Sequence, residues 1–392
     1  MKRCLHLPWR ADRLGAAIRF DRNEFSGAFG DLGTDFPLIV GMILIADLDA
    51  ASVLIMFGMM QLVTGLLYGI PMPAQPLKAM AVIVITQRLS GNVLYGGGLA
   101  IGLIMLVLSV TGLIDRLAKT VPKNVVRGIQ CGLGLQLAML ALKDYVPAEG
   151  VAGYGLALAA FGLVLVLLGN RRVPPAPFVI GLGVLYAVLV RIDIDILGQS
   201  LGISLPRFDV PTVQDVMNGF LVLTLPQIPL SLGNSILATR QIVEDLFPKR
   251  AVSVRKISLT YALMNLLNPF LGGIPTCHGS GGIAGHYAFG ARTGGSVIMY
   301  GGLYLCLGLF FSGGFAEVIL LFPKPILGMI LLFEGLTILQ LMQDMAHSKA
   351  DLTVVFLVGL IAVALPYGYV IGLVGGTLLA SLARKRLMVL TE

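Results

Sequence analysis

Charged residues are scarce in this sequence. They make up 12% of its 392 residues, whereas average soluble domains carry about 25%. Cysteine is rarer still, and the spacing of the four cysteines fits neither a zinc site nor a disulfide framework (Cys4, Cys131, Cys277 and Cys306). This composition argues against a soluble enzyme, a disordered chain and a nucleic-acid-binding protein, and it gives no reason to expect a metal or a cofactor.

Apolar residues take the place of the missing charge. They make up 56% of the chain, and the mean hydropathy is +0.88. Apolar runs of roughly 15 to 22 residues, each about long enough to cross a bilayer as a helix, recur from Phe25 to Ser381. About fourteen such segments can be drawn, and several of them are short or broken. The sequence therefore predicts an all-α polytopic membrane protein that lies in the lipid bilayer.

The basic residues indicate the orientation. They fill the segment 1–24 and every second loop after it, and five fall in the intervening loops (Arg88, Lys143, Arg191, Arg207 and Lys324). Cytoplasmic loops carry an excess of Lys and Arg, so we expect both termini in the cytoplasm and a multi-pass protein of the cell membrane. The net charge of +7 is then an orientation signal, not the mark of a nucleic-acid partner.

Three local patterns recur in the same order about 200 residues apart: Gly30-Asp31 with Gly233-Asn234, Gly69-Ile70-Pro71 with Gly273-Ile274-Pro275, and Pro122-Lys123 with Pro323-Lys324. Seven spans separate the partners, and because seven is odd the two halves must lie upside down relative to each other. Two inverted repeats are the plan of many secondary transporters. We expect a cytoplasmic segment at 1–24, a first repeat of seven spans at 25–196, an external linker at 197–211 and a second repeat at 212–386, with no regulatory domain after it.

Two stretches interrupt the apolar sequence. Residues 68–76 hold three prolines, and residues 272–282 are rich in glycine. Non-helical backbone at membrane depth survives only where protein or a water-filled cavity satisfies it. A short apolar helix follows each stretch, from Pro76 to about Arg88 and from Gly279 to about Gly290. The two half-helices thus begin near the midplane with their N-termini facing each other, and their free N–H groups predict a site for an anion.

Ionisable residues near the half-helices are candidates for function. Lys78 is costly near the bilayer centre, so it is either the counter-charge of a bound oxyanion or the partner of an acid. Asp31, in the first span, could carry a coupling proton, hydrogen-bond the site or neutralise Lys78. Glu334, in the middle of the twelfth span, is the second candidate for proton coupling, with a structural partner role as the alternative.

Neutral polar groups are the candidates for contact with the substrate. Asn234 occupies the repeat position of Asp31, and an amide suits an anion better than a carboxylate does. The predicted substrate-binding set combines Lys78 with neutral groups around the two half-helices: Gln75, Asn234, Thr276, His278, Gly279, Ser280 and Gly281. Cys277 and His278 could instead form a catalytic pair in a membrane-embedded enzyme, although neighbours on an extended chain point to opposite faces.

Three stretches resemble signature sequences of the molybdate transporter family, which is related to the sulfate permeases: Gly27-Ala-Phe-Gly-Asp-Leu-Gly-Thr34, Pro71-Met-Pro-Ala-Gln-Pro-Leu-Lys78 and Pro275-Thr-Cys-His-Gly-Ser-Gly-Gly-Ile-Ala284. The resemblance spans essentially the whole chain. It implies seven plus seven inverted spans, with a core bundle (spans 1–4 and 8–11) that holds the site and a gate bundle (spans 5–7 and 12–14). Ala288 departs from the family, whose members often carry a basic residue there.

The resemblance also implies a function. It points to a secondary active transporter of a tetrahedral oxyanion, molybdate first, that works by alternating access as a proton symporter and is not an enzyme. Sulfate has the same charge and shape and is the alternative substrate, and a second copy of the chain is a candidate partner. The sequence has no ATP-binding motif of the Gly-x-x-x-x-Gly-Lys-Ser/Thr type, so an ion gradient must supply the driving force.

Overall fold

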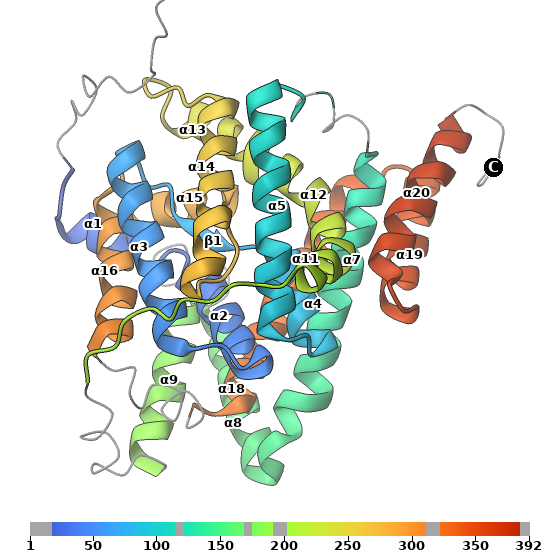
Figure 1. Ribbon diagram of the computed structural model, residues 1–392. Coiled ribbons are helices and arrows are strands. Elements are labelled where there is room, and N and C mark those ends of the chain that lie inside the picture. Colours follow the sequence, from blue (N-terminus) through green and yellow to red (C-terminus); the bar gives the residue numbers. More distant parts are fainter. Residues whose placement is uncertain are drawn as a thin grey trace, which may run out of the picture.

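The structure is a computed structural model (Figure 1) that describes residues 18–114, 116, 121–167, 175–190, 202–310 and 322–384. Most of these residues are helical, which confirms the all-α prediction. Within them, five helical stretches are long and apolar enough to cross a membrane: Ala50–Tyr68, Gly91–Thr111, Lys123–Leu167, Val213–Leu246 and Lys324–Met345. Shorter apolar helices stand between them, as expected for spans that are broken or stop at the midplane.

The first half of the chain runs from an N-terminal helix to a pair of helices near one end of the molecule. Its elements are α1 (Arg22–Gly27), α2 (Leu32–Ala46), α3 (Ala50–Tyr68), β1 (Ala74–Pro76), α4 (Lys78–Gln87), α5 (Gly91–Thr111), α7 (Lys123–Leu140), the π-helix η1 (Ala141–Tyr145), the 3-10 helix η2 (Val146–Glu149), α8 (Gly150–Leu167) and α9 (Pro175–Val190).

The second half repeats this order with a more irregular first span. Its elements are α11 (Val213–Gly219), the π-helix η3 (Phe220–Thr224), α12 (Leu225–Leu230), the π-helix η4 (Ser231–Ala238), α13 (Thr239–Leu246), α14 (Val254–Leu267), the 3-10 helix η5 (Asn268–Leu271), β2 (Thr276–His278), α15 (Ser280–Ala288), α16 (Gly295–Phe310), α18 (Lys324–Gln340), the 3-10 helix η6 (Leu341–Met345), α19 (Lys349–Ala364) and α20 (Gly368–Arg384).

The repeat partners found in the sequence take equivalent places in the structure. Gly69 and Gly272 both end a helix in the left-handed region, with φ of 62° and 66°. Pro122 and Pro323 are the N-caps of α7 and α18. These matches are consistent with two inverted repeats of seven spans, while the domain boundaries stay a prediction; residues 191–196 of the first repeat and 197–201 of the linker lie outside the described residues.

The helices form two groups. In the core bundle, α3 packs on α16 and α5 packs on α11 and α14; in the gate bundle, α7 packs on α18 and α19, and α19 packs on α20. Figure 1 shows α3 and α16 side by side on the left and α7, α19 and α20 on the right. The core bundle consists of α2–α5 and α11–α16, and the gate bundle consists of α7–α9 and α18–α20. The two groups meet mainly where α4 touches α7 and where α2 touches α18.

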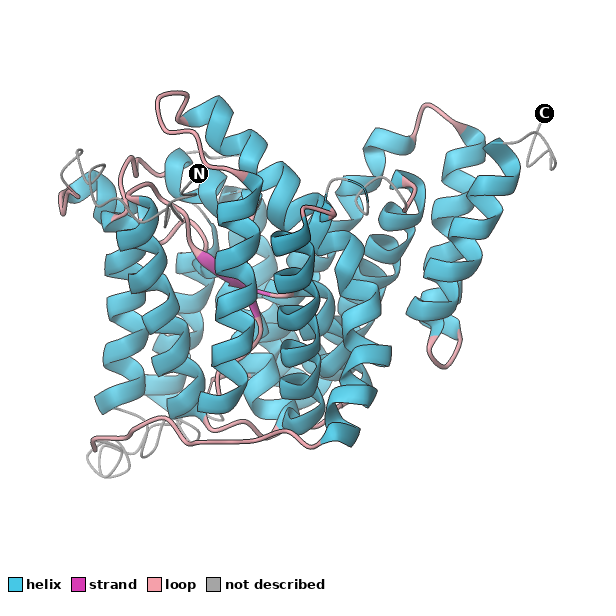
Figure 2. Cartoon of the chain, turned by 45° about the horizontal axis from the view of Figure 1, so that its top comes forward, coloured by secondary structure: helices cyan, strands magenta, loops and turns pink. Residues whose placement is uncertain are grey.

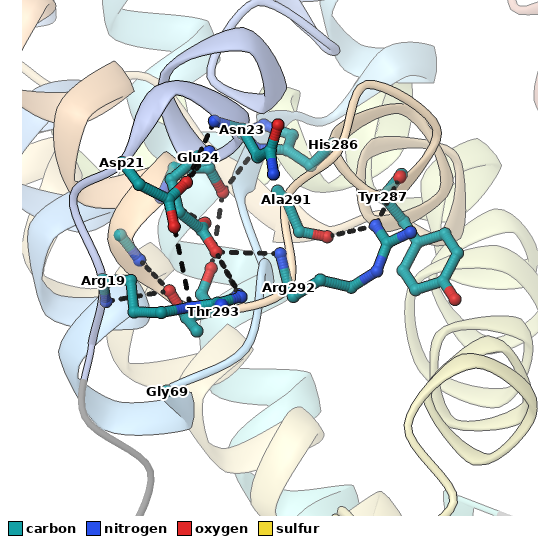
Figure 3. Close-up of polar contacts among 12 residues, drawn as sticks. Arg19, Asp21, Asn23, Glu24, Gly69, His286, Tyr287, Ala291, Arg292 and Thr293 are labelled. Atoms are coloured by element: carbon teal, nitrogen blue, oxygen red, sulfur yellow. Dashed lines mark hydrogen bonds and ion pairs between the residues drawn. The ribbon is translucent and has the colours of Figure 1, made fainter.

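The N-terminal helix α1 is fixed to the core by a buried carboxylate. Asp21 caps α1, and Glu24, which is fully buried, accepts hydrogen bonds from the backbone N–H groups of Arg292 (2.9 Å), Thr293 (2.8 Å) and Ser296 (3.1 Å). Figure 3 shows Glu24 reaching into the turn that begins α16, where N–H groups would otherwise be unpaired. The end of the segment 1–24 is therefore packed against the protein, and residues 1–17 lie outside the described residues.

Candidate functional site

The centre of the site is a short ladder between two segments about 200 residues apart. β1 and β2 pair antiparallel, with Ala74 opposite His278, Gln75 opposite Cys277 and Pro76 opposite Thr276. Figure 2 shows these strands in the interior, with helices on either side. Pro76 lies in the strand, so the prediction that it opens the first half-helix is wrong: α4 begins at Lys78. Pairing with β2 holds Pro76 in extended geometry.

The N-terminus of α15 is open. Gly279 is its N-cap, and no side chain caps it. Gly281 is exposed, and no described atom lies within 4 Å of the place where a Cβ on Gly281 would be. Asn234 and Gly233 are exposed on η4, which packs on α15. Uncapped N–H groups at a helix N-terminus that faces open space are a site for an anion.

The N-terminus of α4 is capped instead. The Gln227 side chain, from α12, accepts hydrogen bonds with its Oε1 from the N–H groups of Ala79 (3.0 Å) and Met80 (3.3 Å), and its Nε2 donates to Ser231 Oγ (3.0 Å). Sequence reasoning missed Gln227, although a glutamine between two prolines (Pro226 and Pro229) inside a span is a signal of broken, polar backbone. The two half-helices are therefore unequal: α15 offers free N–H groups and α4 offers Lys78.

Lys78 is paired with Glu334. Its Nζ lies 2.7 Å from Glu334 Oε1, and the exposed fractions of the two side chains are 35% and 4%. Of the two readings of Lys78, the structure shows the pairing with an acid, and that acid is Glu334, not Asp31. The pair also joins α4 of the core bundle to α18 of the gate bundle.

Asp31 lies behind the open end of α15. It is the N-cap residue of α2, in the turn that breaks the first span, and it is buried. Gln75 Nε2 donates to both of its carboxylate oxygens at 2.6 Å, and Thr34 Oγ1 donates to Oδ1 at 2.7 Å. The Gln75 side chain in turn contacts Gly279, and a Cβ on Gly282 would lie 2.6 Å from Asp31 Oδ2. The structure thus brings Asp31, Gln75 and Gly279 together.

Thr276 and His278 are tied to protein partners. His278 is fully buried, with Nε2 2.8 Å from Thr260 Oγ1 and Nδ1 3.4 Å from the Pro73 carbonyl oxygen. The Thr276 backbone N–H and carbonyl bond the Asn265 amide. In this geometry both residues position β2, and the direct contact with an oxyanion expected of His278 and Thr276 stays a prediction. Ser280, half-buried at the first position of α15, is closer to the open space.

Asp35 is a further buried acid. It lies one turn after Asp31 on α2, its Oδ2 accepts a hydrogen bond from Tyr300 at 3.3 Å, and no partner is found for its Oδ1. Among the described residues, no group of three or more His, Cys, Asp or Glu side chains could hold a metal ion.

Helices that cross the bilayer, two half-helices that leave a central strand pair, and a division into two bundles define a membrane transporter. Two solved structures share this fold. The transmembrane domain of the cyanobacterial bicarbonate transporter BicA aligns with a TM-score of 0.67 at 16% identity, over 93% of this chain and 98% of that one. The murine anion transporter SLC26A9 in its inward-facing state aligns with a TM-score of 0.68 at 15% identity, over 93% and 68%.

The sequence identifies the family. The profile described as "Molybdate transporter of MFS superfamily" matches residues 23–137 and 219–338. "Molybdate transporter 1" of Arabidopsis thaliana is 34% identical over 402 residues, which cover 91% of this chain and 87% of that protein. The chain therefore belongs to the molybdate transporter family, as its signature stretches predicted, and it is a multi-pass membrane transporter and not an enzyme. The family implies an oxyanion as the substrate.

Proposed function

We propose that this protein is a secondary active transporter that carries molybdate across the membrane. The observation that carries this proposal is the open N-terminus of α15, which starts from the same ladder as Lys78. The exposed Asn234 lies on η4, which packs on α15. The three-residue ladder is about 7 Å long at about 3.4 Å per residue step. It leads at one end to the start of α4 and at the other to the start of α15, each two residues beyond it. One small oxyanion would bind between the N–H groups of α15 and the Lys78 ammonium.

The groups around this space favour a fully deprotonated dianion. The amide of Asn234, the Ser280 hydroxyl and the α15 N–H groups are donors, and the nearby carboxylates, Asp31 and Glu334, are already engaged by Gln75 and Lys78. Phosphate keeps a proton near neutral pH, and wherever the amide, hydroxyl and N–H groups all donate to the anion, that proton lacks an acceptor. Once the site is closed to water, this would cost about 1–3 kcal/mol. Molybdate and sulfate carry no such proton, and the names of the relatives favour molybdate.

The transport cycle follows from the two bundles. The core bundle holds the site, and movement against the gate bundle would expose the site to each side in turn. We place the protein in the cell membrane with both termini cytoplasmic, on the strength of the basic loops, and expect it to work as a homodimer. Proton coupling would use one of two buried acids at the site, Asp31 or Glu334.

The test is a binding titration of the purified protein with molybdate, tungstate, sulfate and phosphate. We expect molybdate and tungstate to bind alike and at least about tenfold more tightly than phosphate, the ratio that about 1.4 kcal/mol produces. Gly281→Leu should abolish binding without unfolding the protein, because its side chain enters open space. Gly302→Leu is the matched control, since the helical Gly302 on α16 also faces open space. Equal competition by phosphate, or normal binding by Gly281→Leu, contradicts the proposal.

A further inference from the structure

We propose that Glu334 is the acid that carries the coupling proton, and that Lys78 links its protonation to the substrate by exchanging one partner for another. This inference rests on the proposed function, since it needs an oxyanion at α15. It starts from one contact, the 2.7 Å ion pair between Lys78 Nζ and Glu334 Oε1. Among the described residues this is the only salt bridge of either side chain, and it joins the core bundle to the gate bundle.

The pair is poised to open. Lys78 is the first residue of α4, where the positive end of the helix disfavours a cation. Its side chain is 35% exposed, so the four-carbon stem has room to turn. A dianion that binds the N–H groups of α15 offers Lys78 a second negative partner beside the first. The ammonium then moves from the Glu334 carboxylate toward the oxyanion.

Glu334 cannot stay charged without Lys78. Its side chain is 4% exposed, and a carboxylate that is buried without a counter-charge is strongly disfavoured relative to the neutral acid. When Lys78 turns away, the carboxylate takes one proton from water and becomes a carboxylic acid. When the substrate leaves, Lys78 returns and the proton is released. Each dianion therefore travels with about one proton.

The other charges near Glu334 support this assignment. Asp31 and Asp35 on α2 are also acids, and a negative charge on either would favour a neutral Glu334. The remaining ionisable groups on elements packed against α18 include no ion-pair partner of Glu334. They are Lys123 and Arg127, both bonded to Asp344; Lys143, Asp144 and Tyr145 on η1; Glu149, which accepts from the Lys324 N–H; Cys131 on α7; Tyr154 on α8; and Tyr186 on α9.

Asp31 differs from Glu334 in one respect that decides the assignment. Its two oxygens accept hydrogen bonds from Gln75 and Thr34, which are neutral. These partners are not drawn away by an anion, so the arrival of substrate leaves the hydrogen bonds of Asp31 in place. Only Glu334 loses its partner when Lys78 moves. Because the broken pair spans the two bundles, the same step loads the proton and removes one ion pair between the core and gate bundles.

The experiment counts the protons taken up when molybdate binds. Calorimetric titrations of sodium molybdate into purified protein, at one pH in buffers of different ionisation enthalpy, give the number of protons per bound anion. We expect a maximum of about one for the wild type, falling to about zero for Glu334→Gln, which binds molybdate but cannot titrate. Glu334→Asp should restore the uptake. Asp31→Asn, and the matched surface control Glu244→Gln, should keep it.

Each result decides a different point. Absence of molybdate binding in the wild type overturns the proposed function itself. Three results overturn the assignment of Glu334. The wild type binds molybdate without proton uptake, Glu334→Gln still takes up about one proton, or Asp31→Asn loses the uptake while it still binds molybdate. If Glu334→Gln does not fold, the double variant Lys78→Gln/Glu334→Gln removes both charges together. It should bind more weakly with no proton uptake, and uptake in this variant also overturns the assignment.

Discussion

Lys78 is the one cation at the described site. Its substitution tests whether the ammonium binds the oxyanion or serves only as the structural partner of Glu334. If its ammonium contacts the oxyanion, Lys78→Gln should weaken molybdate binding by about 1.5–3 kcal/mol, the range for a hydrogen bond between charged groups, or roughly 10–150-fold in Kd. Equilibrium binding to the purified variant measures this. Lys249→Gln, which removes an exposed lysine in the loop after α13, is the control and should bind as the wild type does.

Lys78→Gln also leaves Glu334 without its partner, so the melting temperature of the variant must be measured as well as its Kd for molybdate. Loss of one member of a buried pair costs about 3–5 kcal/mol, less here because Lys78 is partly exposed. The melting temperature should therefore fall in Lys78→Gln and recover in Lys78→Gln/Glu334→Gln. The affinity for molybdate should not recover in the double variant. Unchanged affinity with a lowered melting temperature would leave Lys78 as a purely structural partner of Glu334.

At the scale of the element, Glu24 acts as the N-cap of a helix to which it does not belong. Its carboxylate accepts three backbone N–H groups at the start of α16. Glu24→Gln keeps the shape but replaces charge-assisted hydrogen bonds with weaker neutral ones, and one amide NH₂ must face a donor. We expect the free energy of unfolding to fall by about 1–3 kcal/mol, seen as a lower melting temperature in detergent.

A matched glutamate controls for the loss of charge alone. Glu244 on α13 is partly exposed and pairs with Arg240 one turn away, a contact worth about 0.3–0.5 kcal/mol. Glu244→Gln should therefore change the melting temperature little. A Glu24→Gln variant as stable as Glu244→Gln would show that α1 does not depend on this carboxylate.

These elements also show what the sequence could predict. The breaks at 68–76 and 272–282 were predictable because proline and glycine act locally on the backbone, and the open helix end at Gly279 follows from the same pattern. The pairing of β1 with β2, the cap on α4 by Gln227 and the bond between Lys78 and Glu334 were not. Each joins segments about 150–260 residues apart, and tertiary contacts of that kind leave no local signal. The strand pairing is also why α4 begins two residues later than expected.

At the scale of the whole molecule, alternating access requires the two bundles to move against each other. One contact between them is well placed for a test: Thr86 Oγ1 on α4 of the core bundle donates to Gln136 Oε1 on α7 of the gate bundle at 3.0 Å. We expect a Thr86→Cys/Gln136→Cys variant treated with a short bis-methanethiosulfonate, which links the two thiols through disulfides, to lose uptake of molybdate into proteoliposomes. Uptake should fall below about a tenth and recover after reduction of the disulfides.

Binding should survive this cross-link, because neither cysteine touches the open end of α15 and a locked transporter still offers its site to one side. The single-cysteine variants, treated in the same way, control for modification of the four native cysteines. Of these, Cys131 and Cys277 are buried, Cys306 is exposed, and Cys4 lies outside the described residues. A cross-linked protein that still accumulates molybdate would show that α4 and α7 keep their contact through the cycle. In that case the interface that changes during the cycle would have to lie elsewhere than between these two helices. Lys78 on α4 and Glu334 on α18 would then have to separate without displacement of α7.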